Sequence, residues 1–242
     1  MRIAQKIAMW SGPRNLSTAL MYSFAARCDC AVVDEPFYGA YLNATGIEHP
    51  MRDAVIASQS TDWAQVAAQC LGQIPQGQSL FYQKHMTMHM IPAFDRGFIK
   101  DLTNVFLIRH PARVIASYAR KREAPTLADI GFVQQAELFD QVAQMQGAAP
   151  LVVDSSDIRA NPRETLSRLC AGLGIPFTEN MLTWPAGPKS YDGVWAPHWY
   201  DEVWKSTCFG GAEGDLPNLS SAFEGLCEAA LPYYARLTPH KI

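Results

Sequence analysis

Short apolar runs alternate with amphipathic helical patterns along most of the chain. The runs are mostly continuous and rich in β-branched or aromatic residues, as are parallel strands that are buried on both faces. A chain with this alternation folds as an α/β structure around a mostly parallel sheet. The predicted strands are Lys6–Trp10, Cys30–Asp34, Ser79–His85, Asn104–His110 and Pro150–Asp154. The predicted helices are Leu16–Arg27, Asp62–Leu71, Ala112–Lys121, Leu127–Gln146, Arg163–Leu173 and a C-terminal one near Ser221–Ala235.

Length and charge narrow the possible functions. The 242 residues suffice for one sizeable core and do not require a second, so we expect one domain over residues 1–242. A formal net charge of -3 lacks the broad basic surface of a duplex-binding protein, so we expect no nucleic-acid partner. The N-terminal apolar run is too short for a secretory signal, and no run approaches the ~18 apolar residues of a membrane span. We therefore expect a cytoplasmic protein without a membrane partner; the sequence leaves the oligomeric state open.

The turn after the first predicted strand has the position of a phosphate-binding loop. It leads into a helix, whose N-terminus favours anions. Gly12 is expected to permit an unusual turn, Arg14 offers a fixed cation, and Ser17 and Thr18 offer hydroxyl donors. The lysine of an ATPase loop is absent, which disfavours magnesium-nucleotide chemistry and leaves a sulfate or phosphate group as the expected ligand. The whole turn comprises Ser11, Gly12, Pro13, Arg14, Asn15, Leu16, Ser17 and Thr18. The alternative is a solvated loop that starts a helix.

A second strand, turn and helix lie at Phe106–Tyr118. Arg109 ends the predicted strand, Pro111 takes the first helical position, and Ser117 follows about two turns into the helix. Both Arg109 and Ser117 can therefore reach one anion beside the first turn.

These two segments resemble the sulfotransferases that use 3′-phosphoadenosine 5′-phosphosulfate (PAPS). The 5′-phosphosulfate loop of that family often reads P-[KR]-S-G-[ST]-T, and residues 13–18 are similar with Asn-Leu in place of Ser-Gly. The 3′-phosphate signature, R-[DN]-P-R-x₄-S, has its spacing in residues 109–117, with His110 and Ala112 as departures. A structural segment of the family is similar to residues 153–177, so the resemblance spans about residues 5–180.

The resemblance implies a P-loop NTPase-like, three-layer α/β sandwich and PAPS as co-substrate, with no metal. The loop with Arg14, Ser17 and Thr18 would neutralise the 5′-phosphosulfate, and Arg109 with Ser117 would hold the 3′-phosphate. Transfer would move a sulfuryl group to a hydroxyl or amine of a small acceptor. Two alternatives stay open: a non-catalytic nucleotide-binding relative, which the Asn15-Leu16 departure allows, and a P-loop small-molecule kinase.

The general base has two candidates. Glu35 follows the second predicted strand at the edge where the loop lies, and the family has a catalytic glutamate in a comparable place. His85 is the rival, because cytosolic members carry a catalytic histidine in a K-x-H segment. Here His85 directly follows Lys84, and side chains alternate along a strand, so Lys84 would face the site instead. Glu35 could also be a solvated loop carboxylate.

The aromatic-rich segment 184–210 shows no clear periodicity. We expect a long ordered loop that covers the site, with aromatic faces for the adenine or the acceptor. Lys189 is a candidate contact to the 3′-phosphate, since family members carry a basic loop late in the chain. Few charges in this segment suggest a small or amphipathic acceptor. The acceptor itself cannot be named from the sequence.

Overall fold

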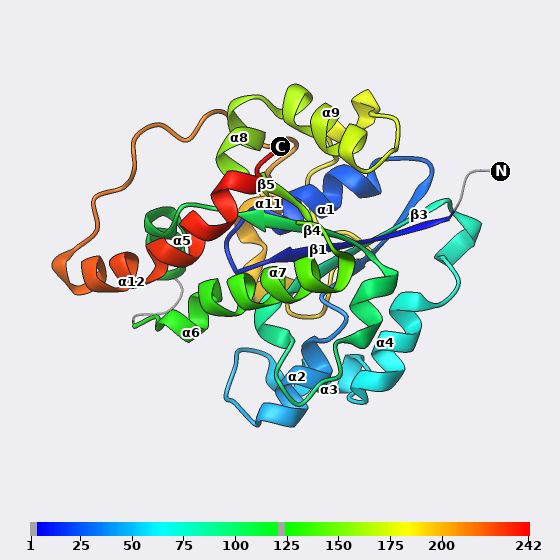
Figure 1. The fold of residues 1–242 in the computed structure, drawn as a ribbon, viewed down its shortest axis with the longest axis horizontal. Coiled ribbons are helices and arrows are strands. Elements are labelled where there is room, and N and C mark those ends of the chain that lie inside the picture. The colour runs from blue at the N-terminus through cyan, green and yellow to red at the C-terminus, as the bar shows by residue number, and fades with distance from the viewer. Residues whose placement is uncertain (1–3, 121–123) are drawn as a thin grey trace.

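A five-stranded parallel sheet forms the centre of the chain, in a computed structural model that describes residues 4–120 and 124–242 (Figure 1). The strand order is β2-β3-β1-β4-β5, and each neighbouring pair is parallel. The strands are β1 Gln5–Ser11, β2 Cys30–Asp34, β3 Leu80–Met86, β4 Thr103–Ile108 and β5 Leu151–Asp154. All five predicted strands are confirmed.

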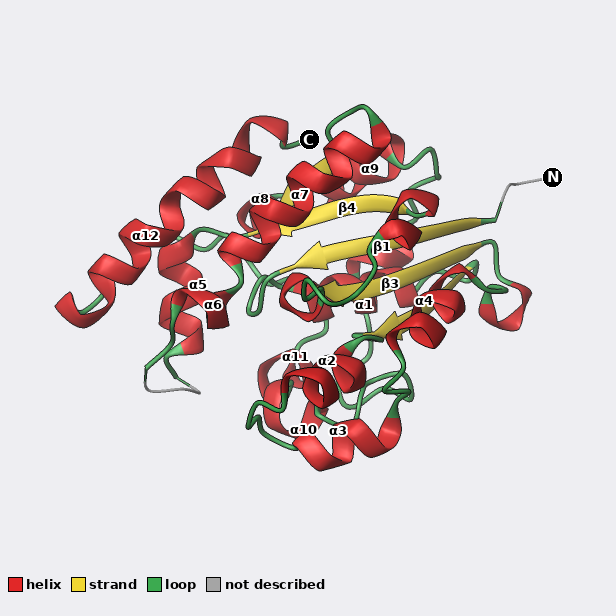
Figure 2. Ribbon diagram, turned by 60° about the horizontal axis from the view of Figure 1, so that its bottom comes forward, coloured by secondary structure: helices red, strands yellow, loops and turns green. Residues whose placement is uncertain are grey.

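Helices cover both faces of this sheet (Figure 2). The helices are α1 Ser17–Ala25, α2 Tyr38–Thr45, α3 Arg52–Ser58, α4 Trp63–Leu71, α5 Pro111–Tyr118, α6 Leu127–Ile130, α7 Phe132–Gln146, α8 Ser155–Ala160, α9 Pro162–Gly172, α10 Ala196–Trp199, α11 Asp201–Lys205 and α12 Ser221–Leu237. One core lies between the sheet and helices α1 and α9, and includes Ile7 and Leu20. Another lies between the opposite face and helices α4 and α7, and includes Trp10 and Phe139. The predicted three-layer α/β sandwich is therefore confirmed.

The helices differ from the predictions in four places, one of which is the short helix α8, to which the patterns assign no element. The predicted helix Leu127–Gln146 is divided at Gly131, whose φ of 72° ends α6 and starts α7. Residues 38–58, to which the patterns assign no element, form α2 and α3. The segment 184–210 contains α10 and α11 rather than an uninterrupted loop. These missed helices are at most eight residues long, too short for a helical period to be recognised. Lys121, the predicted end of α5, lies outside the described residues.

The parallel arrangement places the carboxyl ends of β1, β2, β3 and β4 at one edge of the sheet. Open α/β sheets bind their ligands beyond this edge. Helices α2, α3 and α10 gather there around a separate apolar cluster that includes Tyr38, Val55 and Trp195 (Figure 2). None of the helices in the described part of the chain is both long and apolar enough to cross a bilayer.

Candidate functional site

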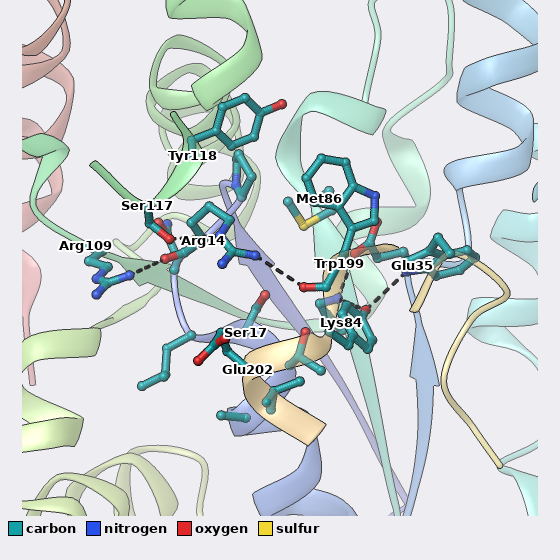
Figure 3. A pocket seen from close by; sticks show the side chains of 18 of the residues that line it. Arg14, Ser17, Glu35, Lys84, Met86, Arg109, Ser117, Tyr118, Trp199 and Glu202 are labelled. Atoms are coloured by element: carbon teal, nitrogen blue, oxygen red, sulfur yellow. Dashed lines mark hydrogen bonds and ion pairs between the residues drawn. The ribbon is translucent and has the colours of Figure 1, made fainter. Parts of the chain in front are cut away.

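A cavity of about 570 Å³ opens at the carboxyl edge of the sheet. Its walls come from the loop after β1, helices α2 and α5, strand β3 and the segment 195–210. Figure 3 shows Arg14, Arg109 and Ser117 on one side of this cavity and Glu35 and Lys84 on the other. The site therefore brings together segments that are far apart in the sequence.

The loop after β1 has a left-handed backbone at Arg14 (φ 62°) and Leu16 (φ 70°). This conformation costs non-glycine residues roughly 1–2 kcal/mol each, so neighbouring groups must hold it. Arg109 Nη1 donates to the Arg14 carbonyl at 2.7 Å, and Ser155 Oγ donates to the Asn15 carbonyl, also at 2.7 Å. The loop is thus fixed by the residue that follows β4 and by the first residue of α8 before any ligand binds.

Gly12 does not supply the unusual backbone that the sequence predicts there. Positive φ occurs at Arg14 and Leu16 instead, and Gly12 is not among the glycines with positive φ. A Cβ on Gly12 would lie 2.9 Å from the carbonyl oxygen of Ile130. The glycine is therefore needed because the loop passes close to the end of α6.

We expect Gly12→Ala to lower the free energy of unfolding by about 1–3 kcal/mol, because backbone must move to admit the methyl group. Denaturant unfolding measures the loss. Gly225→Ala is the matched control, since a Cβ there meets no atom within 4 Å. Equal stability of the two variants would contradict the close approach.

Arg14 lies at the centre of the loop side of the cavity. Its Nε donates to Ser117 Oγ at 3.0 Å, and its Nη1 donates to the Trp199 carbonyl at 3.4 Å. Burial lowers the pKa of Arg14, and the charges of Arg120 and Arg109 lower it further. These cations crowd one wall, so that wall attracts an anion.

Most of the other predicted loop residues line the cavity, and the rest lie beneath the loop. Pro13, Asn15, Leu16, Ser17 and Thr18 line the cavity with Arg14. Ser11 is fully buried beneath it, with its hydroxyl against the sulfur of Met86. Ser11 and Gly12 therefore shape the loop from below.

Arg109 and Ser117 both line the cavity, as the spacing in the sequence predicts. His110, one of the two departures from the family pattern, caps α5: its Nδ1 accepts from the Ala112 amide at 3.2 Å. Although His110 departs from the family pattern, it therefore still caps the helix that carries Ser117.

Glu35 lines the opposite wall of the cavity and is 9% exposed. Its backbone has a φ of 41°, and its carbonyl accepts from Gln59 Nε2 at 3.1 Å. Burial raises the pKa of Glu35; the positive charge of Lys84 opposes this shift and Asp34 adds to it. A strained backbone and a buried carboxyl group with a raised pKa are features of catalytic acids and bases.

Lys84 connects Glu35 to a buried polar network. Its Nζ donates to Asp34 Oδ1 at 2.8 Å, to Glu35 Oε1 at 2.7 Å and to the Tyr200 hydroxyl at 2.6 Å. Tyr200 in turn donates to Asp34 Oδ2 at 2.6 Å. Burial would lower the pKa of Lys84, but Asp34, Glu35 and Tyr200 raise it well above the ordinary value. An ammonium group has three donors, and here all three are engaged, so Lys84 positions Glu35 rather than presenting a free cation.

His85 does not line the cavity. It stacks on Trp10 with ring centroids 4.4 Å apart, and its Nε2 lies 3.1 Å from Gln83 Oε1. Burial lowers its pKa to about 3. The alternation along β3 turns Lys84 toward the cavity and His85 into the core on the other face. The His85 ring is therefore directed away from a ligand in the cavity.

Lys189 is also absent from the cavity wall. Its Nζ lies 5.1 Å from the centre of the Tyr22 ring and donates to the Gly187 carbonyl. Its backbone N–H donates to Asp192 Oδ2 at 2.8 Å. Lys189 thus belongs to the packing of its own loop against α1.

Aromatic side chains line the cavity near Glu35, and those outside segment 184–210 were not predicted from the sequence. His89 lies between the rings of Tyr38 and Tyr41, with centroids 4.7 and 4.8 Å away, and its Nε2 is 4.0 Å from Glu35 Oε2. Trp199, which the expected aromatic segment supplies, stacks with His49 and Tyr118, with ring centroids 5.6 and 6.3 Å away. These rings come from four separate segments, so no local pattern could have brought them together.

Comparisons with known proteins give a family and a fold. The sulfotransferase domain family matches residues 5–240. Two curated proteins of Arabidopsis thaliana, branched-chain-amino-acid aminotransferase-like proteins 1 and 2, are 35% and 33% identical over 97% of this chain. The chain spans 42% and 41% of their lengths, less than half of each.

Solved structures of low sequence identity share the fold. A sulfotransferase domain from the curacin biosynthetic pathway has a TM-score of 0.57 at 15% identity, covering 98% of this chain and 99% of its own. A sulfotransferase domain from the olefin synthase of Synechococcus PCC 7002 has a TM-score of 0.55 at 18% identity, covering 94% of each chain. A sulfotransferase from Alicyclobacillus acidocaldarius has a TM-score of 0.54 at 12% identity, covering 97% and 94%. The predicted P-loop-type fold is confirmed.

Proposed function

The chain belongs to the sulfotransferase domain family, and we propose that it moves a sulfuryl group from PAPS to a hydroxyl or amine of a small acceptor. The observation that carries the proposal is the division of the cavity. Cations and hydroxyls occupy one wall, and a buried carboxylate occupies the other. A bisphosphorylated donor and a proton acceptor are the two things that sulfuryl transfer requires.

The residues of the cationic wall fit a donor with two anionic groups. Arg14, Ser17 and Thr18 lie at the start of α1, where the first N–H groups have no partner within the helix. They would neutralise the 5′-phosphosulfate. Arg109 and Ser117 would hold the 3′-phosphate, the group that distinguishes this donor from ATP.

The reaction is a balanced displacement. The bound donor supplies an activated sulfuryl group, which leaves a phosphate oxygen as it bonds to the acceptor oxygen or nitrogen. By analogy with phosphoryl transfer, the protein contributes positioning and charge neutralisation. Glu35 accepts the acceptor proton, and Lys84 keeps the carboxylate oriented. Arg14 stabilises the charge that develops on the sulfuryl and bridging oxygens.

The acceptor end of the cavity favours a small or amphipathic molecule. Aromatic side chains of Tyr38, Tyr41 and Trp199 line it beside Glu35. Aromatic rings offer apolar contact area and little charge complementarity for a sulfated polysaccharide. Activity restricted to highly anionic glycans would overturn this part of the proposal.

The names of the Arabidopsis relatives do not alter the proposal. Those proteins are more than twice as long as this chain, so their names describe much more than the matched portion.

We expect the chain to bind adenosine 3′,5′-bisphosphate without magnesium, and Arg109→Ala to weaken this binding by about 1.5–3 kcal/mol, roughly ten- to a hundredfold. The reason is the loss of a charge-assisted contact to the 3′-phosphate. Isothermal titration calorimetry measures both affinities. Arg236→Ala is the control, since Arg236 pairs with Asp140 on the surface away from the cavity.

The same titration separates the rival functions. Tighter binding of ATP with magnesium than of the bisphosphate would favour a kinase. Tight binding of the bisphosphate with no transfer to any acceptor in a broad panel would favour a non-catalytic relative. Failure to bind the bisphosphate would overturn the proposal.

A further inference from the structure

A buried carboxylate lies among three arginines beside the cavity. The side chain of Glu213 is 4% exposed and belongs to the segment between α11 and α12. Its Oε2 lies 3.2 Å from Arg113 Nε, its Oε1 lies 3.3 Å from Arg159 Nη1, and Oε1 also pairs with Arg109 Nη2. These three residues form what we call the arginine cluster: Arg109, Arg113 and Arg159.

The same arginines hold the backbone around Glu213. Arg113 donates to the carbonyls of Glu213 at 3.1 Å and Gly214 at 2.5 Å, and Arg159 Nε donates to the Gly211 carbonyl at 3.0 Å. Residues 211–214 thus cover the arginine cluster and contribute the carboxylate of Glu213 to it. The segment passes α8 on its way to α12 (Figure 1).

The charges of this arrangement do not balance. Three guanidinium groups face one carboxylate from Glu213, which leaves an excess of about two positive charges. A phosphate monoester carries about -1.5 to -2 charge at pH 7 and three strong acceptor oxygens. Arginines bind phosphate with paired N–H groups, as they bind carboxylate, so the two anions compete for the same donors.

The cluster is accessible from the cavity. Arg109 and Arg159 line the cavity wall together with Gly210, whereas Arg113 and Glu213 are not among the lining residues. A ligand that enters through the cavity would therefore meet the arginines that Glu213 occupies.

We infer that Glu213 is an internal anion that occupies the binding site of the donor 3′-phosphate. The incoming phosphate displaces the Glu213 side chain, and Arg113 and Arg159 then join Arg109 as phosphate ligands. This inference rests on the proposed function, because it takes PAPS as the donor. It assigns two further binding residues, and it couples donor binding to movement of residues 211–214.

The first test compares Glu213→Gln with Asp215→Asn by calorimetry. Both variants remove one negative charge from the same segment, but Asp215 is exposed. We expect Glu213→Gln to bind adenosine 3′,5′-bisphosphate roughly tenfold or more tightly than the unmodified protein, because the phosphate no longer displaces a charged competitor. Asp215→Asn should change this affinity less than about twofold, and neither variant should alter binding of adenosine 5′-monophosphate, which lacks the 3′-phosphate.

The possible results test the role of Glu213 separately from the proposed function. Equal bisphosphate affinity in Glu213→Gln and the unmodified protein would overturn the inference and leave the proposed function standing. Absence of bisphosphate binding in all three proteins would overturn both. Bisphosphate binding only in Glu213→Gln would support both.

A second measurement uses the unmodified protein, so it does not depend on the stability of a variant. Amide hydrogen exchange is followed in the unmodified protein, free and saturated with each nucleotide. We expect the bisphosphate to speed exchange in residues 211–216, and the monophosphate to leave it unchanged. Slower or unchanged exchange there in the bisphosphate complex would overturn the inference.

Discussion

Glu35→Gln is expected to lower kcat by about 10²–10⁴-fold while leaving the affinity for adenosine 3′,5′-bisphosphate unchanged, because general-base catalysis contributes a factor of this size. The glutamine amide keeps the shape of the side chain and an oxygen for the 2.7 Å contact with Lys84, but it accepts no proton. Steady-state assays with PAPS and an active acceptor measure kcat, and calorimetry measures nucleotide binding. Glu228→Gln, at an exposed position of α12, is the matched control. A Glu35→Gln variant with more than a tenth of the original kcat would exclude Glu35 as the base.

The pH profile gives the same test a second readout. A base works in its ionised form, so activity should fall as pH falls through the pKa of Glu35. Burial raises the pKa of Glu35. The fall in activity on the acidic side of the pH profile, its acidic limb, should therefore occur at a higher pH than the pKa of an ordinary glutamate would give. The limb should disappear in the residual activity of Glu35→Gln.

Lys84→Met is expected to lower the free energy of unfolding by about 3–5 kcal/mol, because it leaves two buried carboxylates without their counter-ion. Asp34 and Glu35 both pair with the ammonium group of Lys84, a residue that is 1% exposed. Denaturant unfolding at neutral pH measures the loss. Lys205→Met, which removes an exposed lysine from α11, is the control.

A double variant separates charge pairing from packing. Asp34→Asn combined with Lys84→Met should lose less stability than the two single variants added together, because one unpaired charge is removed with the other. The surviving activity of Lys84→Met should also show its acidic limb at higher pH, since the lysine charge opposes the raised pKa of Glu35. Additive losses with an unmoved limb would show that Lys84 serves packing alone.

The sheet could be predicted from the sequence because its signal is local. Strands buried on both faces are short continuous apolar runs, and each can be recognised without its neighbours. The helices α2 and α3 could not be predicted from the sequence, since seven or eight residues give barely two turns of periodicity. The break between α6 and α7 depends on one residue, Gly131, in a segment that otherwise reads as a single helix.

The site was predictable only where its residues share a motif. Arg14, Ser17 and Thr18 follow one strand, and Arg109 with Ser117 follows another, so parallel strand order alone brings them together. Alternation along β3 also predicted that Lys84 and His85 face opposite ways. Their catalytic roles stay predictions.

Other parts of the site depend on distant contacts. The bond from Lys84 to Tyr200 and the contact between Arg109 and Glu213 each join residues more than a hundred positions apart. No spacing rule links such pairs. Gly12 shows the same limit, because its neighbour Ile130 belongs to another element. The sequence predicted that a glycine is needed there for an unusual backbone conformation, and that prediction is wrong.

The strand order also has a consequence for synthesis. The central strand β1 carries Ile7 to Trp10, all fully buried, yet its partners are β3 and β4, and Ser11 pairs in register with Met86. At roughly 5–20 residues per second, a ribosome needs several seconds to supply those partners. During that time β1 has no neighbouring strand to pair with. Strand β1 is therefore protected only after β3 and β4 have followed it, and slower folding or crowding at that stage would favour aggregation.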